Sequence, residues 1–407
     1  MESDYFPSDI VVDILSRLPV ETLFRFKSVS TNWDAMITPT NHYLVSMHLK
    51  NYTNNPATKA SLLATYLDDY DYESYPFPSA QNPFRSISLC PDDDDRPPIH
   101  VGQSLLERIV CGTGNGLFLL DTSYHHHYSL WNPATREIRP LPDPPFASEF
   151  ASRPQTHQKH SSDYCGVGVD LVANDIKVVL IRNNACCACD ALGYRIPSSS
   201  RFPLPVFVYT SRSNCWSEVA GGYHPYEDGV LLESEEDDLF SCHTYSDGFF
   251  YWLFKDYYGN VEGQVVAFDM GNNLFHKINC PVDDPQPCHI GLFRGSVALF
   301  DGQLDYSRCD IWLLSRNNNT GGQSSWIKHL TLGVFPEELI VYGCWKDDQF
   351  IAQTRWNDQL LLYYTGSKQI KVLASKSWSA TRLNIYKQSL LSTLPVSLTN
   401  GKGLQEE

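Results

Sequence analysis

Cysteine is the residue type in this 407-residue chain that comes closest to forming a chemical site. Cys186, Cys187 and Cys189 lie together, with Cys165 nearby in the sequence, and cysteine thiolates are preferred zinc ligands. A structural zinc site normally shows paired Cys-x₂₋₄-Cys units, whereas a single irregular cluster occurs here. We therefore interpret residues 183–201 as an insertion that carries free thiols, and we predict no metal site.

Three further local patterns resemble chemical sites but fit turns and loops better. His125–His127 cannot all face one metal ion on a strand, because successive side chains point to opposite sides. The glycines at 112, 114 and 116 precede no helix whose N-terminus could bind phosphate, so we predict a hairpin turn there. The acidic run from Glu233 to Asp238 is typical of a solvated loop, since acid–base catalysis needs buried carboxylates in different environments.

The sequence contains none of the common catalytic motifs. A serine nucleophile elbow, a His-Glu-x-x-His helix, a Walker loop and the kinase motifs are all missing. We therefore disfavour an enzyme, and we predict no catalytic residue and no cofactor.

The charge and composition narrow the class of partner and the compartment. The net charge of −16 argues against nucleic acid, because phosphate neutralisation supplies most of the affinity for it. No apolar run approaches the roughly 18 residues that cross a bilayer, and the first residues do not form a signal peptide. The 12 cysteines are too sparse for a disulfide scaffold. We predict a cytoplasmic and/or nuclear protein that binds neither nucleic acid nor membrane.

Residues 6–49 show a helical period that the rest of the chain lacks. One face of a first helix carries Ile10, Val11, Ile14, Leu15 and Leu18, in a segment that Ser8 can cap and that Pro19 ends. The apolar side of a second helix carries Leu23, Phe26 and Val29. A third helix, capped by Ser30 or Thr31 and ended by Pro39, turns Trp33, Met36 and Ile37 inward.

Three such short helices cannot bury all of these apolar faces against one another. One possibility is a helical cap on a larger domain. The other is a docking module whose remaining apolar surface belongs to a partner protein.

Residues 6–33 closely resemble the F-box, which favours the docking module. The match consists of a Phe-Pro opening at 6–7, Ile-Leu-x-x-Leu-Pro at 14–19, Arg-Phe-Lys-x-Val at 25–29, and then Ser30 and Trp33. Phe6 stands where the family usually has leucine. The resemblance implies docking on a Skp-type adaptor, which links to cullin and RING subunits. The interface residues that it implies are Phe6, Pro7, Ile10, Leu18, Pro19, Leu23, Val29 and Trp33. Of these, Trp33 and Leu23 can instead pack the helices together.

From about residue 60 onward, short apolar strands alternate with polar turns. In a recurring unit, an apolar residue ends one strand and another apolar residue opens the next strand seven residues later. The instances are Trp131…Ile138, Val169…Ile176, Tyr209…Trp216, Phe268…Phe275 and Tyr363…Ile370, with a longer sixth unit, Trp312…Trp326. Their first residues lie 38, 40, 59, 44 and 51 residues apart. This period favours a β-propeller of about six blades over a β-sandwich with periodic hairpins.

The same body resembles the plant F-box-associated domain, a kelch-like family that includes the S-locus F-box type. The resemblance rests on Gly-Asn-Gly-Leu-Phe at 114–118, Leu-Trp-Asn-Pro-Ala-Thr-Arg at 130–136 and Leu-Pro at 141–142. It continues through Gly-Val-Gly-Val-Asp at 166–170 and Asn-Asp-Ile-Lys-Val-Val at 174–179, where Ile176 replaces the usual tyrosine.

Together these features predict a mainly β protein with a small N-terminal α module. We divide it into an F-box at 1–50, a Pro- and Asp-rich connection at 51–100, a propeller-like domain at 101–395 and a flexible tail at 396–407. Leu62–Leu67 and Phe84–Leu89 in the connection are expected to be strands that complete the ring. We expect residues 60–100 and the C-terminal strands to meet near the closure of the ring, and the strand around Leu360–Tyr364 to be needed for stability.

The resemblance implies a substrate receptor of an SCF ubiquitin ligase, which holds a target near the conjugating enzyme and does no bond chemistry itself. One alternative is a propeller that binds carbohydrate or small molecules through its many Tyr and Trp residues. Another is a propeller hydrolase with carboxylates clustered in the central channel. The acidic runs at 92–95 and 233–238 would favour a target with a basic patch, unless they serve only solubility.

Overall fold

The structure is a computed structural model of the whole chain, and it describes most of the helical module and the strands of the body. The described residues are 7–38, 41–53, 55, 58, 60–67, 84–89, 99–100, 107–122, 127–146, 164–173, 175–182, 203–223, 243–254, 264–282, 288–302, 306–315, 324–346, 348–356, 359–374 and 380–393.

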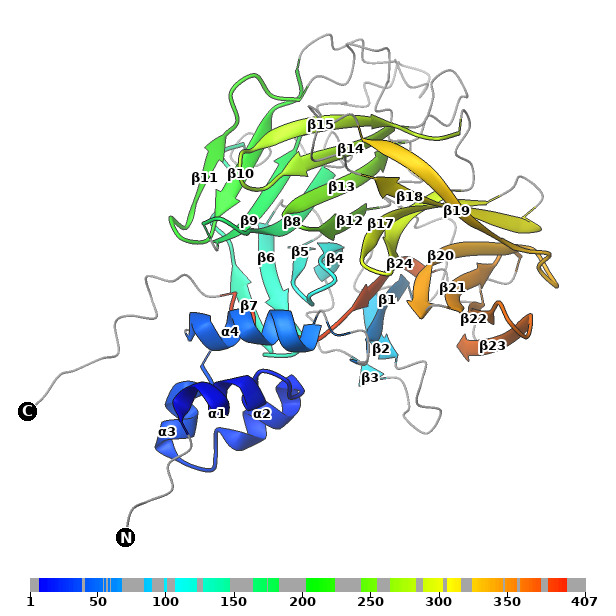
Figure 1. Cartoon of the computed structure of the whole chain (residues 1–407). Helices are drawn as coiled ribbons and strands as arrows, with labels where there is room; N and C mark the ends of the chain where they lie inside the picture. Colours follow the sequence, from blue (N-terminus) through cyan, green and yellow to red (C-terminus); the bar gives the residue numbers. More distant parts are fainter. Residues whose placement is uncertain are drawn as a thin grey trace, which may run out of the picture.

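The body is a β-propeller of six four-stranded antiparallel sheets, which confirms the predicted architecture (Figure 1). Blade 1 contains β1 (Ser61–Leu67), β2 (Phe84–Leu89), β3 (Ile99–His100) and β24 (Ala380–Tyr386). Blade 2 contains β4 (Glu107–Gly112), β5 (Phe118–Thr122), β6 (His127–Asn132) and β7 (Glu137–Pro140). Blade 3 contains β8 (Tyr164–Asp170), β9 (Asp175–Ile181), β10 (Val206–Thr210) and β11 (Cys215–Glu218).

The remaining blades continue the ring in chain order. Blade 4 contains β12 (His243–Ser246), β13 (Phe249–Phe254), β14 (Gln264–Asp269) and β15 (Leu274–Asn279). Blade 5 contains β16 (Cys288–Phe293), β17 (Ser296–Gly302), β18 (Arg308–Ser315) and β19 (Ser325–Gly333). Blade 6 contains β20 (Leu339–Lys346), β21 (Gln349–Thr354), β22 (Leu360–Tyr364) and β23 (Gln369–Ala374). Each of β4, β8, β12, β16, β20 and β24 is an edge strand of its sheet. Contacts of β4 with β8, of β12 with β16, of β16 with β20 and of β20 with β24 place these edge strands on the inside of the ring.

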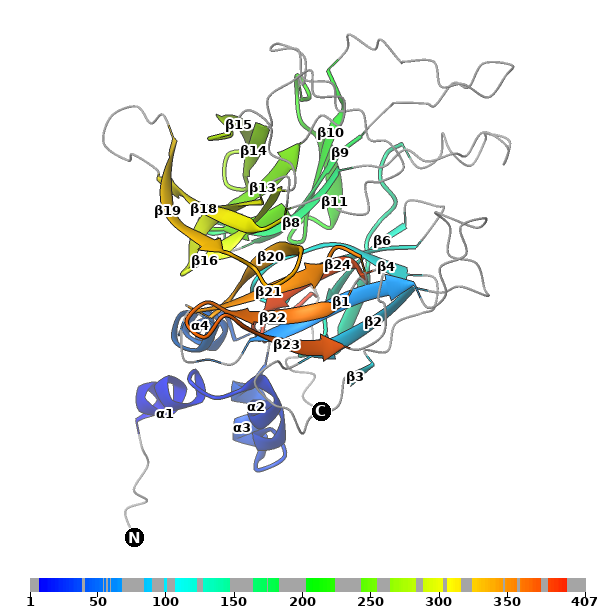
Figure 2. The same cartoon turned by 90° about the vertical axis from the view of Figure 1, so that its right-hand side faces the viewer.

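The C-terminal strand closes the ring, but it is not the strand that the sequence suggested. β24 pairs with β1 from Ser61↔Tyr386 to Tyr66↔Ala380, and β1 pairs with β2. Figure 2 shows β24 and β1 side by side in one sheet, close to β20 of blade 6. The predicted meeting of residues 60–100 with the C-terminal strands is confirmed, but the strand that makes it is β24. Leu360–Tyr364 is β22, the third strand of blade 6, so its expected importance for stability cannot come from closing the ring. Closure removes the open edges that an unclosed sheet would expose.

Five of the predicted units are hairpins in the predicted register. Trp131 lies opposite Ile138, and the same holds for the units that start at 169, 209, 268 and 363. The sixth unit is displaced, because a bulge between Ile311 and Trp312 places Trp312 opposite Lys328. Blade 3 contains two units and blade 1 contains none, so six units match six blades partly by coincidence.

The tight hairpins share one geometry and one face of the propeller. In the outer hairpins of blades 2, 3, 4 and 6 the last turn residue has a positive φ: Arg136, Asn214, Asn273 and Lys368. Asp269 fixes its turn by accepting hydrogen bonds from the backbone N–H groups of Gly271 and Asn272. We call the face where strands 1–2 and 3–4 of each blade connect the turn face. The opposite face, at the other end of these strands, is the loop face.

The helical module has four helices rather than the three expected. They are α1 (Ser8–Leu15), α2 (Val20–Phe26), α3 (Thr31–Met36) and α4 (His42–His48), followed by a π-helical turn, η1 (Leu49–Thr53). The capping predictions had mixed outcomes. Ser30 accepts a hydrogen bond from the Trp33 N–H as predicted, whereas Ser8 lies inside α1 and Pro7 occupies its N-cap position.

Helix α4 joins the module to the propeller. It lies between the other three helices and the strands (Figure 1). The module core, which includes Val12, Leu15, Leu23, Leu44 and Val45, also contains Val169 from the end of β8 and Leu390 and Leu391 after β24. The module therefore packs on the turn face, where β8 ends and β24 leaves its blade.

Candidate functional site

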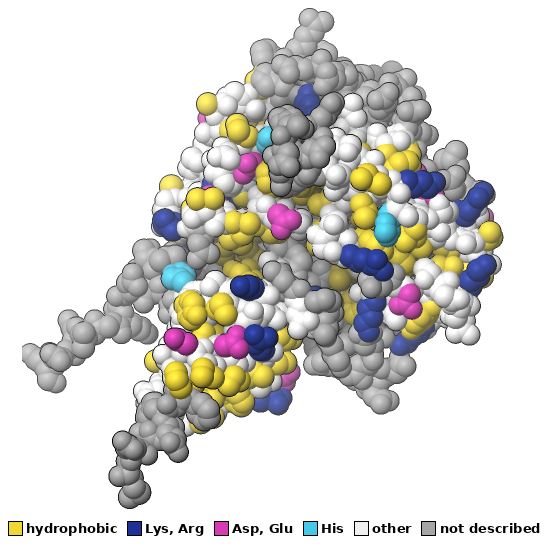
Figure 3. All heavy atoms as spheres, in the orientation of Figure 1, with side chains coloured by type: hydrophobic (Ala, Val, Ile, Leu, Met, Phe, Trp, Pro, Cys, Tyr) yellow, Lys and Arg dark blue, Asp and Glu magenta, His cyan; other side chains and the backbone are white. Residues whose placement is uncertain are grey.

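An apolar stripe on α1 remains exposed after the module has folded. Pro7, Ile10 and Ile14 follow the i, i+3, i+7 spacing of one helix face, while Val12 and Leu15 point into the core. Ile10 is 48% exposed and Ile14 is 53% exposed. Figure 3 shows hydrophobic side chains gathered on the helical module, away from the propeller. We call Pro7, Ile10 and Ile14 the α1 stripe; it is a surface that a second protein could cover.

The sequence-predicted interface residues differ in exposure. Pro7, Ile10, Pro19 and Val29 are exposed. Leu18 and Trp33 are half-buried, and Trp33 packs edge-on against Phe26 with ring centroids 5.3 Å apart. Leu23 is fully buried, so it belongs to the module core and not to the surface. Phe6 lies outside the described residues. Ile14 was missed, although its position one turn after Ile10 was a readable signal.

A segment that the sequence did not reveal ties the module to the propeller. Residues 387–393, which we call the strap, follow β24 along the turn face. Leu390 and Leu391 are 1% and 7% exposed, and both lie in the module core. Lys387 Nζ donates to the Asn55 carbonyl at 2.7 Å, on the chain that leads from the module to β1.

Side chains of blade 2 hold the strap from the propeller side. Asn132 Nδ2 donates to the carbonyls of Ser389 (3.1 Å) and Leu391 (2.8 Å), while its Oδ1 accepts from the Ala134 N–H. Glu137 Oε2 accepts from the Thr393 N–H at 2.9 Å, and Arg139 Nη1 donates to the Thr393 carbonyl at 2.9 Å. The Asn of the Leu-Trp-Asn-Pro motif thus fixes both its own turn and the strap, which holds the module at one position on the ring.

His48 is a buried titratable group inside the module. Its Nε2–H donates to the Leu18 carbonyl at 3.0 Å. Its ring stacks on the ring of Tyr52, with the two ring centroids 4.8 Å apart. Nδ1 is buried and has no hydrogen-bond partner among the described residues. Burial lowers the pKa of His48 to about 4, and the hydrogen bond to Leu18 offsets only part of that effect. The folded module therefore holds this ring neutral.

The His48 pKa predicts a loss of stability in mild acid. The unfolded chain takes up a proton near pH 6.5, whereas the folded chain resists it down to about pH 4. Stability is therefore complete above pH 6.5 and declines as the pH falls towards 4. Between pH 7 and pH 5 we expect His48 to account for a loss of about 2 kcal/mol.

Urea unfolding of the wild type and of His48→Gln at several pH values measures this contribution. Subtracting the two curves removes the titration of the other histidines. The wild type should lose more stability than the variant over this range, and parallel curves would contradict the assignment.

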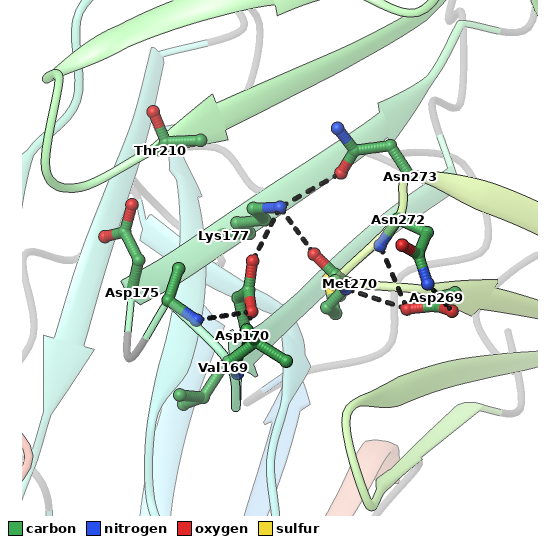
Figure 4. Close-up of polar contacts among 12 residues, drawn as sticks. Val169, Asp170, Asp175, Lys177, Thr210, Asp269, Met270, Asn272 and Asn273 are labelled. Atoms are coloured by element: carbon green, nitrogen blue, oxygen red, sulfur yellow. Dashed lines mark hydrogen bonds and ion pairs between the residues drawn. The ribbon is translucent and has the colours of Figure 1, made fainter.

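A buried ion pair in blade 3 is connected to blade 4 through its lysine (Figure 4). Lys177 Nζ in β9 lies 3.0 Å from Asp170 Oδ2, and it also donates to the Met270 carbonyl and to Asn273 Oδ1 in the next blade. The two side chains are only 8% and 6% exposed. Burial alone would raise the pKa of Asp170, but hydrogen bonds from Ala173, Lys177 and Val172 leave it below the usual value. These donors and acceptors satisfy one another, so the ion pair stabilises the packing of blade 3 against blade 4.

The other chemical candidates lie in turns or outside the described residues. The glycine series forms the β4–β5 turn, with Gly116 at a φ of 74°. His127 opens β6 and pairs with Asp143 at 2.7 Å on the surface. Residues 92–95, 123–126, 183–201 and 233–238 lie outside the described residues, and with them the cysteine cluster and both acidic runs. Cys165 is a buried residue of β8.

Within the described part of the chain, no group of three or more His, Cys, Asp or Glu residues is placed to hold a metal. The only carboxylates on the described inner strands are Glu107 and Asp170, and Asp170 is bound by Lys177. No described helix is long and apolar enough to span a membrane. The channel strands thus lack, over their described length, the carboxylate cluster that a hydrolase would need.

Most of the described tryptophans are used in packing. Trp131, Trp252 and Trp345 are buried, and Trp33, Trp216, Trp312 and Trp326 are half-buried. Among the described tryptophans only Trp356 is exposed. Apart from Trp356, the described tryptophans are therefore used for packing and are not free to stack on carbohydrate.

A four-helix module fixed to the turn face of a six-bladed propeller defines a protein with a docking module and a separate binding body. Comparison with known families agrees: residues 66–373 match the F-box associated beta propeller domain, and residues 4–38 match the F-box domain. The chain belongs to the family of F-box proteins with this propeller domain.

The relatives are F-box proteins of Arabidopsis thaliana. F-box protein At5g49610 is 25% identical over 390 residues, which cover 92% of this chain and 93% of that protein. F-box/kelch-repeat protein At3g23880 is 21% identical and covers 95% of each chain. F-box protein CPR1 is 24% identical, covering 91% of this chain and 84% of that protein. Among solved structures, the nidogen/laminin complex matches with a TM-score of 0.40 and 8% identity, over 80% of this chain and 96% of that chain.

Proposed function

We propose that this protein is a non-catalytic substrate receptor of an SCF ubiquitin ligase. In this function the F-box binds a Skp-type adaptor, which connects it to cullin and RING subunits, and the propeller holds a target protein for ubiquitination. The observation that carries the proposal is the exposed α1 stripe within the F-box match. Such a complex would work in the cytoplasm, the nucleus or both.

The arrangement of the module supports a mechanism based on proximity. The strap and α4 attach the F-box to the turn face, so the loop face points away from the adaptor. A target on the loop face would be held at a fixed orientation relative to the rest of the ligase. Tethering then raises the effective concentration of a target lysine at the conjugating enzyme.

Replacing the two isoleucines of the α1 stripe tests adaptor binding. In Ile10→Glu/Ile14→Glu, two exposed apolar side chains become charged, so a desolvated interface there would lose both contacts. We expect the affinity for a Skp-type adaptor to fall at least about 100-fold in isothermal titration. Because both residues are exposed, the melting temperature should change little.

Tyr43→Glu, an exposed position on α4, is the matched control and should bind the adaptor normally. If the double variant binds as tightly as the wild type, the stripe does not form the adaptor interface.

A further inference from the structure

Three segments on the loop face form one fixed platform between blades 5 and 6. They are residues 306–307 before β18, 334–338 between β19 and β20, and 355–356 after β21. Their backbones bind one another: Phe335 N–H donates to Ser307 O at 2.9 Å, and Arg355 N–H donates to Glu338 O at 3.2 Å. Phe335 is buried and packs edge-on against Tyr363 in β22, with the ring centroids 5.0 Å apart. This contact fixes the platform on blade 6.

The platform presents large apolar side chains to solvent. Trp356 is 72% exposed and Val334 is 65% exposed. The Arg355 guanidinium lies between two rings, 4.2 Å from the centre of Tyr306 and 4.7 Å from the centre of Trp356. The stacking and the backbone bonds hold these groups in place before any partner arrives, which lowers the entropy cost of binding.

The composition of this surface is that of a protein-binding hot spot. Tryptophan, tyrosine and arginine are the residue types that most often dominate binding energy at interfaces. Elsewhere in the described part of the chain the tryptophans are at least half-buried, so exposure of Trp356 is not a general property of the fold. An exposed indole on a rigid platform therefore fits an interaction surface.

Arg355 in the platform and Arg308, which directly follows its segment 306–307 at the start of β18, indicate the chemistry of the partner. Arg355 uses Nη1 for one ion pair with Glu338, at 3.3 Å, and the other N–H groups of its guanidinium bind none of the described residues. Arg308 packs beside Gly333, next to Val334, and its guanidinium makes no ion pair within the described ranges. Planar guanidinium groups with free donors match carboxylates, and the neighbouring Trp356 and Val334 match an apolar side chain.

We propose that Tyr306, Val334, Arg355 and Trp356 form a docking surface for a target segment that carries a carboxylate next to an apolar side chain. This inference rests on the proposed function, because it names the target chemistry of the propeller. The surface lies on the loop face, whereas the F-box packs on the turn face, so target and adaptor can bind together.

Peptide selection on the full-length chain tests the proposal without an identified target. A phage library of random peptides is selected on the immobilised wild type, with Trp356→Ala as the counter-selection protein. Enriched peptides should carry Asp or Glu within two positions of Leu, Phe or Trp. Synthetic versions should bind at least tenfold more weakly to Trp356→Ala and to Arg355→Gln. Val172→Ala, at a residue that is 95% exposed on the turn face, should bind them like the wild type.

Each other outcome overturns the inference. Peptides that bind Trp356→Ala as tightly as the wild type place recognition elsewhere. Enrichment of basic peptides would point to the acidic runs at 92–95 and 233–238. No enrichment at all would mean that the platform does not bind extended segments. Titration of the same samples with the adaptor distinguishes a failure of the docking surface from a failure of the receptor function. Trp356→Ala should bind the adaptor with the wild-type affinity, independently of the result with the peptides.

Discussion

A chain that ends at residue 378 is expected to lose cooperative unfolding altogether. This truncation removes β24, the strand that links blade 1 to the rest of the ring. It exposes the edge of β1 and leaves Phe118 without Tyr386, whose ring packs edge-on against it at 5.3 Å. An open six-bladed ring with an unpaired inner edge should aggregate or unfold below room temperature. Differential scanning calorimetry measures the outcome.

Two longer chains separate ring closure from the strap. A chain ending at residue 393 keeps every described residue and should melt like the full-length protein. A chain ending at residue 386 keeps β24 but loses the strap, and it should melt at an intermediate temperature with the propeller intact. If the chain ending at 378 melts like the full-length protein, then β24 does not hold the ring together.

Lys177→Met should destabilise the propeller by about 3–5 kcal/mol, because it leaves the buried carboxylate of Asp170 without its cation. It also removes the donor to the Met270 carbonyl in blade 4. That is a large part of the total stability of an ordinary domain. Urea unfolding at pH 7 is the measurement.

The double variant Lys177→Met/Asp170→Asn is the matched control. The amide that replaces the Asp170 carboxylate would keep an acceptor oxygen for the Val172 and Ala173 N–H groups but carry no charge. The double variant should therefore be more stable than Lys177→Met alone. Equal stability of the two would show that the charge of Asp170 does not need Lys177.

The hairpins of the propeller could be predicted from the sequence because they are local. Trp131 and Ile138 are separated by a single turn, so residue type and spacing determine their pairing. The bulge in β18 could not be predicted from the sequence, because a bulge shifts the strand register without changing the apolar pattern. The blade count was right partly because a second unit in blade 3 compensated for the absence of one in blade 1.

The contacts that the sequence did not predict join segments far apart in the chain. β24 and β1 pair across more than three hundred residues, and Asn132 binds the strap at Ser389 and Leu391. Nothing local distinguishes β24 from β22 as the closing strand. Helix α4 had a local signal, since Asn41 caps it and Leu44, Val45 and His48 share one face.

The sequence also did not reveal which apolar residues of the helical module are buried and which are exposed. Both Leu23 and Ile10 are apolar residues on short helices, and both fit the F-box pattern. Leu23 is fully buried while Ile10 is 48% exposed, because only the packing of α1 and α2 on α4 and the strap decides which face is covered. The candidate adaptor surface thus required the structure, although the module that carries it did not.

Reconstitution of a ligase core tests most directly whether this protein is an SCF receptor. The full-length chain, a Skp-type adaptor and the N-terminal part of a cullin are mixed, and the mixture is analysed by gel filtration with light scattering. We predict a single complex with one copy of each protein, from which Ile10→Glu/Ile14→Glu is absent although it is folded. If the wild-type chain elutes apart from an adaptor–cullin complex at micromolar concentrations, the proposed function is wrong.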